Sequence, residues 1–223
     1  ITLGSGSDTV SSGAAADTIL STTANLNLND TIDGGAGTDI LQLTTDGSTV
    51  IDADFTNVDN VETLTTTADA QMTSATIGTL AAAAGLATVT MADTSAADTL
   101  VVAAGFTNNL TVNLPSDAAA GNTITATNYT GVLTVAADAT DLDSNASTIA
   151  GGTGTADELQ VTGSAALTAI LTASMTGVEK ITAVGTAGGF SLTTADASIA
   201  AGASLTIDTT AGDDDAFTIN AAL

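Results

Sequence analysis

Residues 4–10 read Gly-Ser-Gly-Ser-Asp-Thr-Val, and residues 13–19, nine positions later, read Gly-Ala-Ala-Ala-Asp-Thr-Ile. A second pair follows after a short insertion, with Asn-Asp-Thr-Ile at 29–32 and Gly-Gly-Ala-Gly-Thr-Asp-Ile-Leu at 34–41. The aspartates of the two pairs are spaced by 9, 13 and 9 residues, and they are Asp8, Asp17, Asp30 and Asp39. The chain therefore opens with a nine-residue Gly/Asp repeat.

The pattern Gly-Gly-x-Gly-x-Asp-x-apolar-x is typical of calcium-binding parallel β-helices. Its glycines permit a positive φ in a tight turn, so that carbonyl oxygens point toward a cation, and its aspartate supplies a charged ligand. The apolar residue two positions after each aspartate is expected in a short strand that stacks in the core. Two successive repeats then make one coil, so cations are expected along the edges, between turns of non-adjacent repeats.

The match to this pattern varies along the chain. Windows 4–10 and 34–41 match in full, window 13–19 has Ala15 in place of its second glycine, and window 28–32 keeps only the aspartate and the apolar residue. A longer repeat is also visible, because residues 34–43 return at 151–161, about 117 residues later, with one residue inserted. At the same offset, 60–64 returns as 177–181. These boundaries predict a calcium-binding roll over 1–45, a β-rich unit over 46–150 and a partial second unit over 151–223.

The composition favours an all-β fold with a core of small side chains. The apolar fraction is 44%, but the chain contains only four Phe, one Tyr and no Trp. Val, Ile and Thr fit a pleated surface, and they dominate short runs that recur between turn residues. Such spacing suggests a solenoid, barrel or sandwich. The runs are 40–44, 61–65, 87–91, 99–102, 110–114, 123–126, 132–136, 158–161, 179–184, 190–194, 205–208 and 216–219.

We therefore predict a calcium-stabilised parallel β-roll or β-helix near the Gly/Asp repeats, followed by further β-helix or β-sandwich segments. The alanine-rich stretch 72–86 is the one candidate helix, with Gly85 as its end, although its Thr and Ser residues suit a strand equally well.

The charge balance points to external cations. The chain has 25 Asp and Glu residues against a single cation, Lys180, and its net charge is −24. This charge repels nucleic acid and anionic lipid headgroups, and it destabilises a compact state unless something neutralises it. Because the chain contains no His and no Cys, its hard oxygen ligands favour calcium over zinc, copper or iron–sulfur clusters. The alternative is a solvated acidic surface of the halophile type.

The candidate calcium ligands lie in the Gly/Asp turns. The cluster at 212–215 aligns loosely with the same turn, and Asp93 and Asp98 are further candidates, although each of these three also suits a solvated acidic turn. The sequence at 138–143 lacks the glycine and the distant Glu of an EF-hand. The predicted metal-site residues are Gly4, Gly6, Asp8, Gly13, Asp17, Asp30, Gly35, Gly37, Asp39, Gly152, Gly154, Asp157 and Asp214.

On these motifs the chain resembles the repeats-in-toxin family of secreted bacterial proteins, and within it the surface-layer and large-adhesin branch. The Asn-Val-Glu-Thr-Leu phrase at 60–64 adds to the resemblance. The resemblance implies type I export from a Gram-negative-type bacterium, folding on extracellular calcium, and self-assembly into lattices, fibres or stalks at the cell surface. Cell-envelope polysaccharide is a further candidate partner. Because the arrays are short and Ala156 lengthens the second turn, the site near Asp157 departs from the family pattern.

Catalysis is not expected from this composition. Nucleophilic catalysis generally needs a base, and the chain has no His, no Cys and one Lys. It also lacks Arg and a phosphate-binding Gly-Lys-Ser/Thr loop. A glycosidase with two carboxylates usually holds sugars against aromatic rings, of which this chain has five.

Three functions agree with these features. The first is a calcium-dependent, self-assembling surface-layer or filament subunit, and the second is a stalk or ligand-presenting segment of a large adhesin. The third is the calcium-binding secretion domain of an exported toxin or hydrolase, for which longer nonapeptide arrays are expected. We expect no membrane span, and because the sequence starts at Ile1, we expect an excerpt or a processed fragment.

Overall fold

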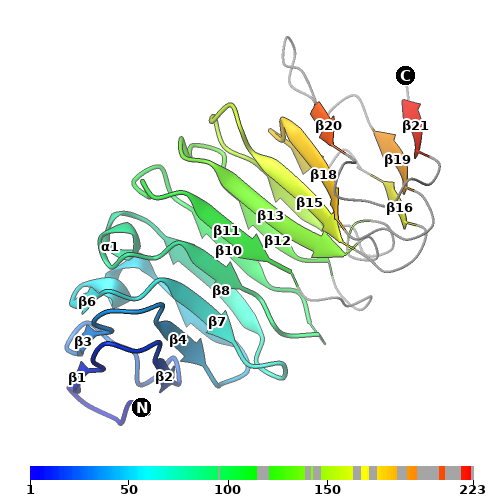
Figure 1. The fold of residues 1–223 in the computed structure, drawn as a ribbon. Coiled ribbons are helices and arrows are strands. Elements are labelled where there is room, and N and C mark those ends of the chain that lie inside the picture. The colour runs from blue at the N-terminus through cyan, green and yellow to red at the C-terminus, as the bar shows by residue number, and fades with distance from the viewer. Residues whose placement is uncertain are drawn as a thin grey trace.

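The computed structural model shows a parallel β-solenoid in which the chain winds into stacked coils (Figure 1). It describes residues 1–94, 96–114, 121–138, 142, 147–162, 167–170, 175–184, 190–194, 206–208 and 217–221. Every strand pairing in these ranges is parallel. The predicted all-β parallel solenoid is therefore confirmed, and the strands continue as a β-helix rather than as antiparallel sandwiches.

Four sheets run along the solenoid, and every predicted run overlaps one of their strands. The nine-stranded sheet contains β2 (Thr18–Ser21), β4 (Ile40–Leu43), β7 (Thr63–Thr66), β9 (Thr88–Thr90), β11 (Leu110–Asn113), β13 (Leu133–Asp138), β15 (Glu158–Thr162), β18 (Lys180–Val184) and β20 (Thr206–Asp208). The six-stranded sheet contains β5 (Ser48–Val50), β8 (Met72–Ile77), β10 (Thr99–Val102), β12 (Thr123–Thr125), β14 (Thr148–Ala150) and β17 (Met175–Thr176).

Two three-stranded sheets complete the described strands. One contains β1 (Thr9–Ser11), β3 (Thr31–Asp33) and β6 (Val58–Asp59), and the other contains β16 (Leu167–Ile170), β19 (Phe190–Thr194) and β21 (Phe217–Ala221). The nine-stranded sheet includes strands from each of the segments 1–45, 46–150 and 151–223. Backbone pairing thus runs across both of the boundaries suggested by the repeats.

The coil length follows from the spacing of the Gly/Asp repeats. Thr9 pairs with Thr31 and Thr18 with Ile40, and the aspartates that precede these strands are joined across 22 residues. One coil therefore holds two nine-residue repeats plus the insertion between them. The turn of the second repeat lies on the turn of the fourth, where the Ala36 N–H donates to the Gly13 carbonyl at 2.8 Å. The predicted stacking of non-adjacent repeats is confirmed.

The core lies between the sheets and consists mainly of aliphatic side chains, with Phe55, Phe106 and Tyr129 also buried, because alternate side chains of each strand point inward. The apolar residue two positions after each aspartate of the repeat is buried, as predicted. In the nine-stranded sheet the buried column consists of Ile19, Leu41, Leu64, Val89, Val112, Val135, Leu159 and Ile181. The facing column of the six-stranded sheet consists of Val50, Ala75, Leu100, Ile124, Ile149 and Met175.

The alanine-rich stretch 72–86 is only partly helical. Its first half is strand β8, because Met72, Ala75 and Ile77 are buried in a sheet between β5 and β10. The helix α1 (Thr79–Ala83) is a single short turn, and Gly85 follows it at φ +99°, as expected for a residue that ends a helix. A 3₁₀ turn, η1 (Asp52–Phe55), precedes β6. In the described ranges no helix is both long enough and apolar enough to cross a membrane.

The stacked core predicts a large difference between the two faces of one strand. We expect Leu64→Ala to lower the free energy of unfolding by about 2–5 kcal/mol, because Leu64 is buried between the side-chain levels of Leu41 and Val89. Thr63, the adjacent outward-facing residue, provides the control. We expect Thr63→Ala to change the free energy of unfolding by about 0.5 kcal/mol or less. Urea unfolding followed by circular dichroism measures both. Equal losses would contradict the inward and outward assignment.

Candidate functional site

Acidic side chains gather just before the strands begin, at two edges of the solenoid. We call the connection that leads into each strand of the nine-stranded sheet the first corner. It contains Asp17, Asp39, Glu62, Asp157 and Glu179, each directly before such a strand. We call the connection that leads into β1, β3 and the six-stranded sheet the second corner. A backbone N–H at a corner has left the strand ladder and still needs an acceptor, and a side-chain oxygen can supply it.

At the first corner, carboxylates join one coil to the next. The Asp17 N–H donates to Asp39 Oδ1 at 2.8 Å, and the Asp39 N–H donates to Glu62 Oε2 at 2.8 Å. Further along the solenoid, the Asp157 N–H donates to Glu179 Oε2 at 3.0 Å. Each accepting carboxylate therefore extends the hydrogen-bond ladder by one residue before the strand begins.

The second corner uses the same device with a mixed set of side chains. The Asp8 N–H donates to Asp30 Oδ1 at 2.9 Å, and the Asp98 N–H donates to Asn122 Oδ1 at 2.8 Å. The Asn122 N–H in turn donates to Ser147 Oγ at 3.2 Å. Glu62, Glu179 and Asn122 are not among the site residues predicted from the sequence. The signal that identifies them is an acceptor side chain one residue before each strand.

The turn from Gly34 to Asp39 depends on its glycines. Gly35 and Gly37 have φ values of +89° and +140°, which residues other than glycine rarely adopt. The neighbouring coils also leave no room for a side chain. A Cβ on Gly35 would lie 1.9 Å from the Gly13 carbonyl oxygen, and one on Gly34 would lie 2.0 Å from the Asn60 carbonyl oxygen. The repeat therefore needs glycine because consecutive coils touch through their backbones.

Asp39 carries the unsatisfied acceptor of this turn. Its side chain is 0% exposed, and its Oδ1 accepts the Asp17 N–H. Its Oδ2 is buried without a hydrogen-bond partner, which is costly for a carboxylate oxygen. The same Oδ2 lies 2.8 Å from the position of a Cβ on Gly34, beside the Asn60 carbonyl oxygen. Asp39 Oδ2 and the Asn60 carbonyl oxygen thus lie near the same point beside Gly34, and hard oxygen donors of this kind are the ligands that calcium prefers.

The donor set at this position would be mostly backbone. Within the described residues, no three or more Asp, Glu, His or Cys side chains gather closely enough to hold a metal ion. A cation at Asp39 would therefore take one carboxylate oxygen together with carbonyl oxygens such as that of Asn60. Calcium accepts such mixed oxygen sets, since backbone carbonyls commonly serve among its ligands.

The second Gly-rich turn, from Gly151 to Asp157, satisfies its own aspartate. Asp157 is 1% exposed, and its Oδ1 accepts the Leu133 N–H at 2.8 Å. Its Oδ2 accepts the Gly152 N–H, also at 2.8 Å. Burial raises the pKa of the Asp157 carboxyl, and these two backbone hydrogen bonds oppose that rise. This turn leaves no orphaned oxygen, so Asp157 and Gly152 fit a cation less well than Asp39 does.

The other predicted residues fall into three groups. Asp30 is buried, and both of its oxygens accept backbone N–H groups, from Asp8 and from Asn27. The Asp8 and Asp17 carboxylates are partly exposed, and Asp8 Oδ2 accepts the Gly4 N–H at 2.9 Å. The remaining glycines lie in the turns, with φ values of +122° and +116° at Gly6 and Gly13 and with Gly154 packed on the Gly131 carbonyl oxygen. Asp214 lies outside the described residues.

The flat faces between the corners carry little charge. None of the six strands of the six-stranded sheet contains a charged residue, and neither do β2, β4, β7, β9 and β11 of the nine-stranded sheet. Their outward positions are mostly threonine. The acids therefore lie mainly at the corners, and the two broad faces are neutral over most of their described length.

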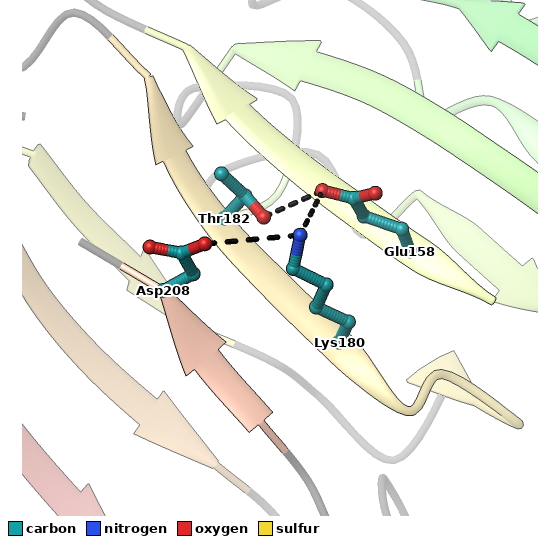
Figure 2. Close-up of polar contacts among 4 residues, drawn as sticks. All are labelled: Glu158, Lys180, Thr182 and Asp208. Atoms are coloured by element: carbon teal, nitrogen blue, oxygen red, sulfur yellow. Dashed lines mark hydrogen bonds and ion pairs between the residues drawn. The ribbon is translucent and has the colours of Figure 1, made fainter. Parts of the chain in front are cut away.

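Lys180 is the single cation of the chain, and it braces three strands of the nine-stranded sheet. Figure 2 shows Lys180 of β18 between Glu158 of β15 and Asp208 of β20. The Lys180 Nζ lies 3.3 Å from Glu158 Oε1 and 3.8 Å from Asp208 Oδ2, and the Thr182 hydroxyl donates to the same Glu158 oxygen at 2.5 Å. Because Lys180 contacts both acids and Thr182 donates to Glu158, we interpret this cluster as a structural brace.

Comparison with known proteins finds no match. No family model matches the chain, and neither does a curated protein or a solved structure. The corners therefore have to be interpreted from their own geometry, and the resemblance to repeats-in-toxin proteins stays a prediction.

The brace predicts a pH dependence. Burial raises the pKa of Glu158, but the hydrogen bonds from Thr182 and Lys180 and the positive charge of Lys180 outweigh it, so the pKa lies below the usual 4.5. Because the pKa of Glu158 is lower in the folded than in the unfolded chain, its ionised carboxylate stabilises the fold above pH 4.5. This contribution is lost as the pH falls through the folded-state pKa. Because the Lys180 side chain is 38% exposed, the contribution should be below about 1 kcal/mol.

We expect Lys180→Met to raise the pKa of Glu158 and to remove this acid-sensitive contribution. Carboxyl NMR titration of the two proteins measures the pKa directly, and Lys180→Arg, which keeps the positive charge, is the control. An unchanged Glu158 pKa in Lys180→Met would show that the ion pair does not form in solution.

Proposed function

We propose that this chain is a structural, non-catalytic segment of a secreted protein that assembles with copies of itself, in a calcium-dependent way, into a surface layer or filament. The observation that carries the proposal is the separation of charge between corners and faces. A net charge of −24 would keep copies apart wherever acids face one another. The neutral threonine-bearing faces are where two solenoids can approach without that repulsion.

Calcium would act at the corners, where the acids lie. The orphaned Oδ2 of Asp39 supports a cation beside Gly34, and the acidic corners as a whole favour divalent counterions. A site with a dissociation constant of about 0.1 mM in about 10 mM calcium would add roughly 2.7 kcal/mol to stability by mass action. Two such sites would approach the net stability of a typical domain. Calcium would therefore promote both folding and close packing.

The assembly is tested by titrating calcium into chelator-treated protein while circular dichroism and light scattering are recorded together. We expect β-structure and large particles to increase over the same calcium range. Particles of unchanged size in chelator and in calcium would contradict calcium-dependent assembly. The Asp39→Asn variant separates folding from binding, because asparagine keeps an acceptor for the Asp17 N–H and removes the charged oxygen. We expect this variant to bind one calcium fewer, with Asp59→Asn, an exposed acid of β6, as the matched control.

The neutral faces give a second test. We expect Thr125→Glu, on the outer face of β12, to reduce assembly at saturating calcium at least tenfold in particle mass, because it places a charge in the contact. The control is Ala104→Glu, which adds the same charge in an exposed turn between β10 and β11. Sedimentation of calcium-loaded samples compares them. Equal assembly by Thr125→Glu and the parent chain would rule out the six-stranded face as the contact.

An adhesin stalk is the second candidate, and the long repeat favours it. The segments 34–43 and 151–161 contribute β4 and β15 to equivalent places in one sheet, so the solenoid can be lengthened by repeating the same unit. A stalk would remain monomeric and rod-like at high calcium, whereas a surface-layer or filament subunit would associate. Small-angle X-ray scattering at increasing protein concentration distinguishes the two.

A further inference from the structure

We infer that Asp33 decides which of the two Gly-rich turns of the first corner takes the cation, by holding the Gly35 N–H away from Asp39. The inference rests on the proposed calcium site at Asp39 and adds to it a positioning residue that is not required as a ligand. It also assigns the turn at Asp157 as a cation-independent copy of the same structure.

The two turns are equivalent in their surroundings. Asp39 and Asp157 each accept a backbone N–H from the preceding coil at 2.8 Å, and each donates its own N–H to a glutamate of the following coil. A Cβ on Gly34 would lie 2.0 Å from the Asn60 carbonyl oxygen, and one on Gly151 would lie 1.9 Å from the Gly177 carbonyl oxygen. The close approach of the first glycine to the following coil is thus alike in both turns.

The turns differ at their second glycine, because Gly35 has a φ of +89° whereas Gly152 is not among the glycines with positive φ, and the N–H groups of the two glycines have different acceptors. In the second turn, the Gly152 N–H donates to Asp157 Oδ2 at 2.8 Å and satisfies it. In the first turn the corresponding donor is Gly35, and its N–H donates to Asp33 Oδ1 at 2.9 Å instead. Asp39 Oδ2 is consequently left buried without a hydrogen-bond partner.

Two sequence differences account for this change. Strand β3 ends in Asp33 before Gly34, whereas β14 ends in Ala150 before Gly151, so the second turn has no carboxylate to attract the glycine N–H. The second turn also contains one more residue, the exposed Ala156, before its aspartate. Asp33 Oδ1 is itself held in place by the Asn60 Nδ2, which donates to it at 2.8 Å. Asp33 therefore directs the N–H, and the freed Asp39 oxygen is available to a cation.

This assignment places the response to calcium at one end of the solenoid. The turn at Asp39 joins the coils of β2, β4 and β7, and these would tighten when the cation binds. The turn at Asp157 joins the coils of β13, β15 and β18 through protein hydrogen bonds alone. Coils near Asp157 would then be formed before calcium is added, and the N-terminal coils would stack upon them.

The test is calcium stoichiometry and affinity, measured by isothermal titration calorimetry on the full chain. We expect Asp33→Ala to weaken binding at the Asp39 site at least tenfold, because the Gly35 N–H can then turn to Asp39. Asp33→Asn keeps the Oδ1 acceptor and should retain the affinity within about threefold. Loss of binding in both variants would instead make Asp33 a charged ligand, and retention in both would remove its role; either result overturns the inference.

The converse experiment is to create a calcium site in the second turn. Ala150→Asp combined with deletion of Ala156 gives the second turn both features of the first, and we expect it to bind one additional calcium ion. Amide hydrogen exchange of the parent chain is an independent readout, in which calcium should slow exchange around Asp39 and leave Gly152 unchanged. Calcium-induced protection at Gly152 would overturn the inference. A parent chain that binds no calcium at all would instead refute the proposed function.

Discussion

The structure depends on hydrogen bonds between the backbones of consecutive coils. Each strand is parallel to the strand about one coil away, so the partners in these strand pairs lie 22 or more residues apart in sequence. At the corners side-chain oxygens extend this ladder, as Asp39 does for the Asp17 N–H and Glu62 for the Asp39 N–H. Because a buried N–H without an acceptor is costly, the corner acids are first of all structural groups. Any role in binding cations is added to that one.

This constraint explains why a chain with so many acids can be compact. Carboxylates that accept backbone N–H groups are stabilised by them, which offsets part of the repulsion between like charges. The strands between the corners need only short aliphatic residues inside and threonine outside, so the faces stay neutral. A flat neutral face and an acidic edge are suited to lateral packing that depends on divalent counterions. The proposed assembly follows from this division, and the orphaned oxygen of Asp39 is the proposed position of one such ion.

The sequence was sufficient for the fold because the repeat specifies both the turn and the buried residue. Val10, Ile19, Ile32 and Leu41 lie in the core as predicted, since each follows its aspartate at a fixed distance. The insertion of four residues between the second and third repeats lengthens the coil from 18 to 22 residues, which the period of nine alone does not reveal. For 72–86 the sequence left helix and strand open, and both occur: the Thr- and Ser-containing first half forms β8, and the alanine run begins in the short helix α1. For the site, the pattern located Asp39 and Asp157 but not their difference, which depends on where the Gly35 and Gly152 N–H groups point.

The most direct measurement is anomalous diffraction from crystals grown in calcium, recorded at a long wavelength where calcium scatters anomalously. We expect a calcium peak within bonding distance of Asp39 Oδ2 beside Gly34, and no peak at the equivalent position beside Asp157. Such a result would show that Asp39, which joins consecutive coils through Oδ1, also binds a cation through Oδ2, the atom that has no hydrogen-bond partner in the fold. The absence of a peak at Asp39 in crystals that hold calcium elsewhere, or equal peaks at both turns, would contradict the account.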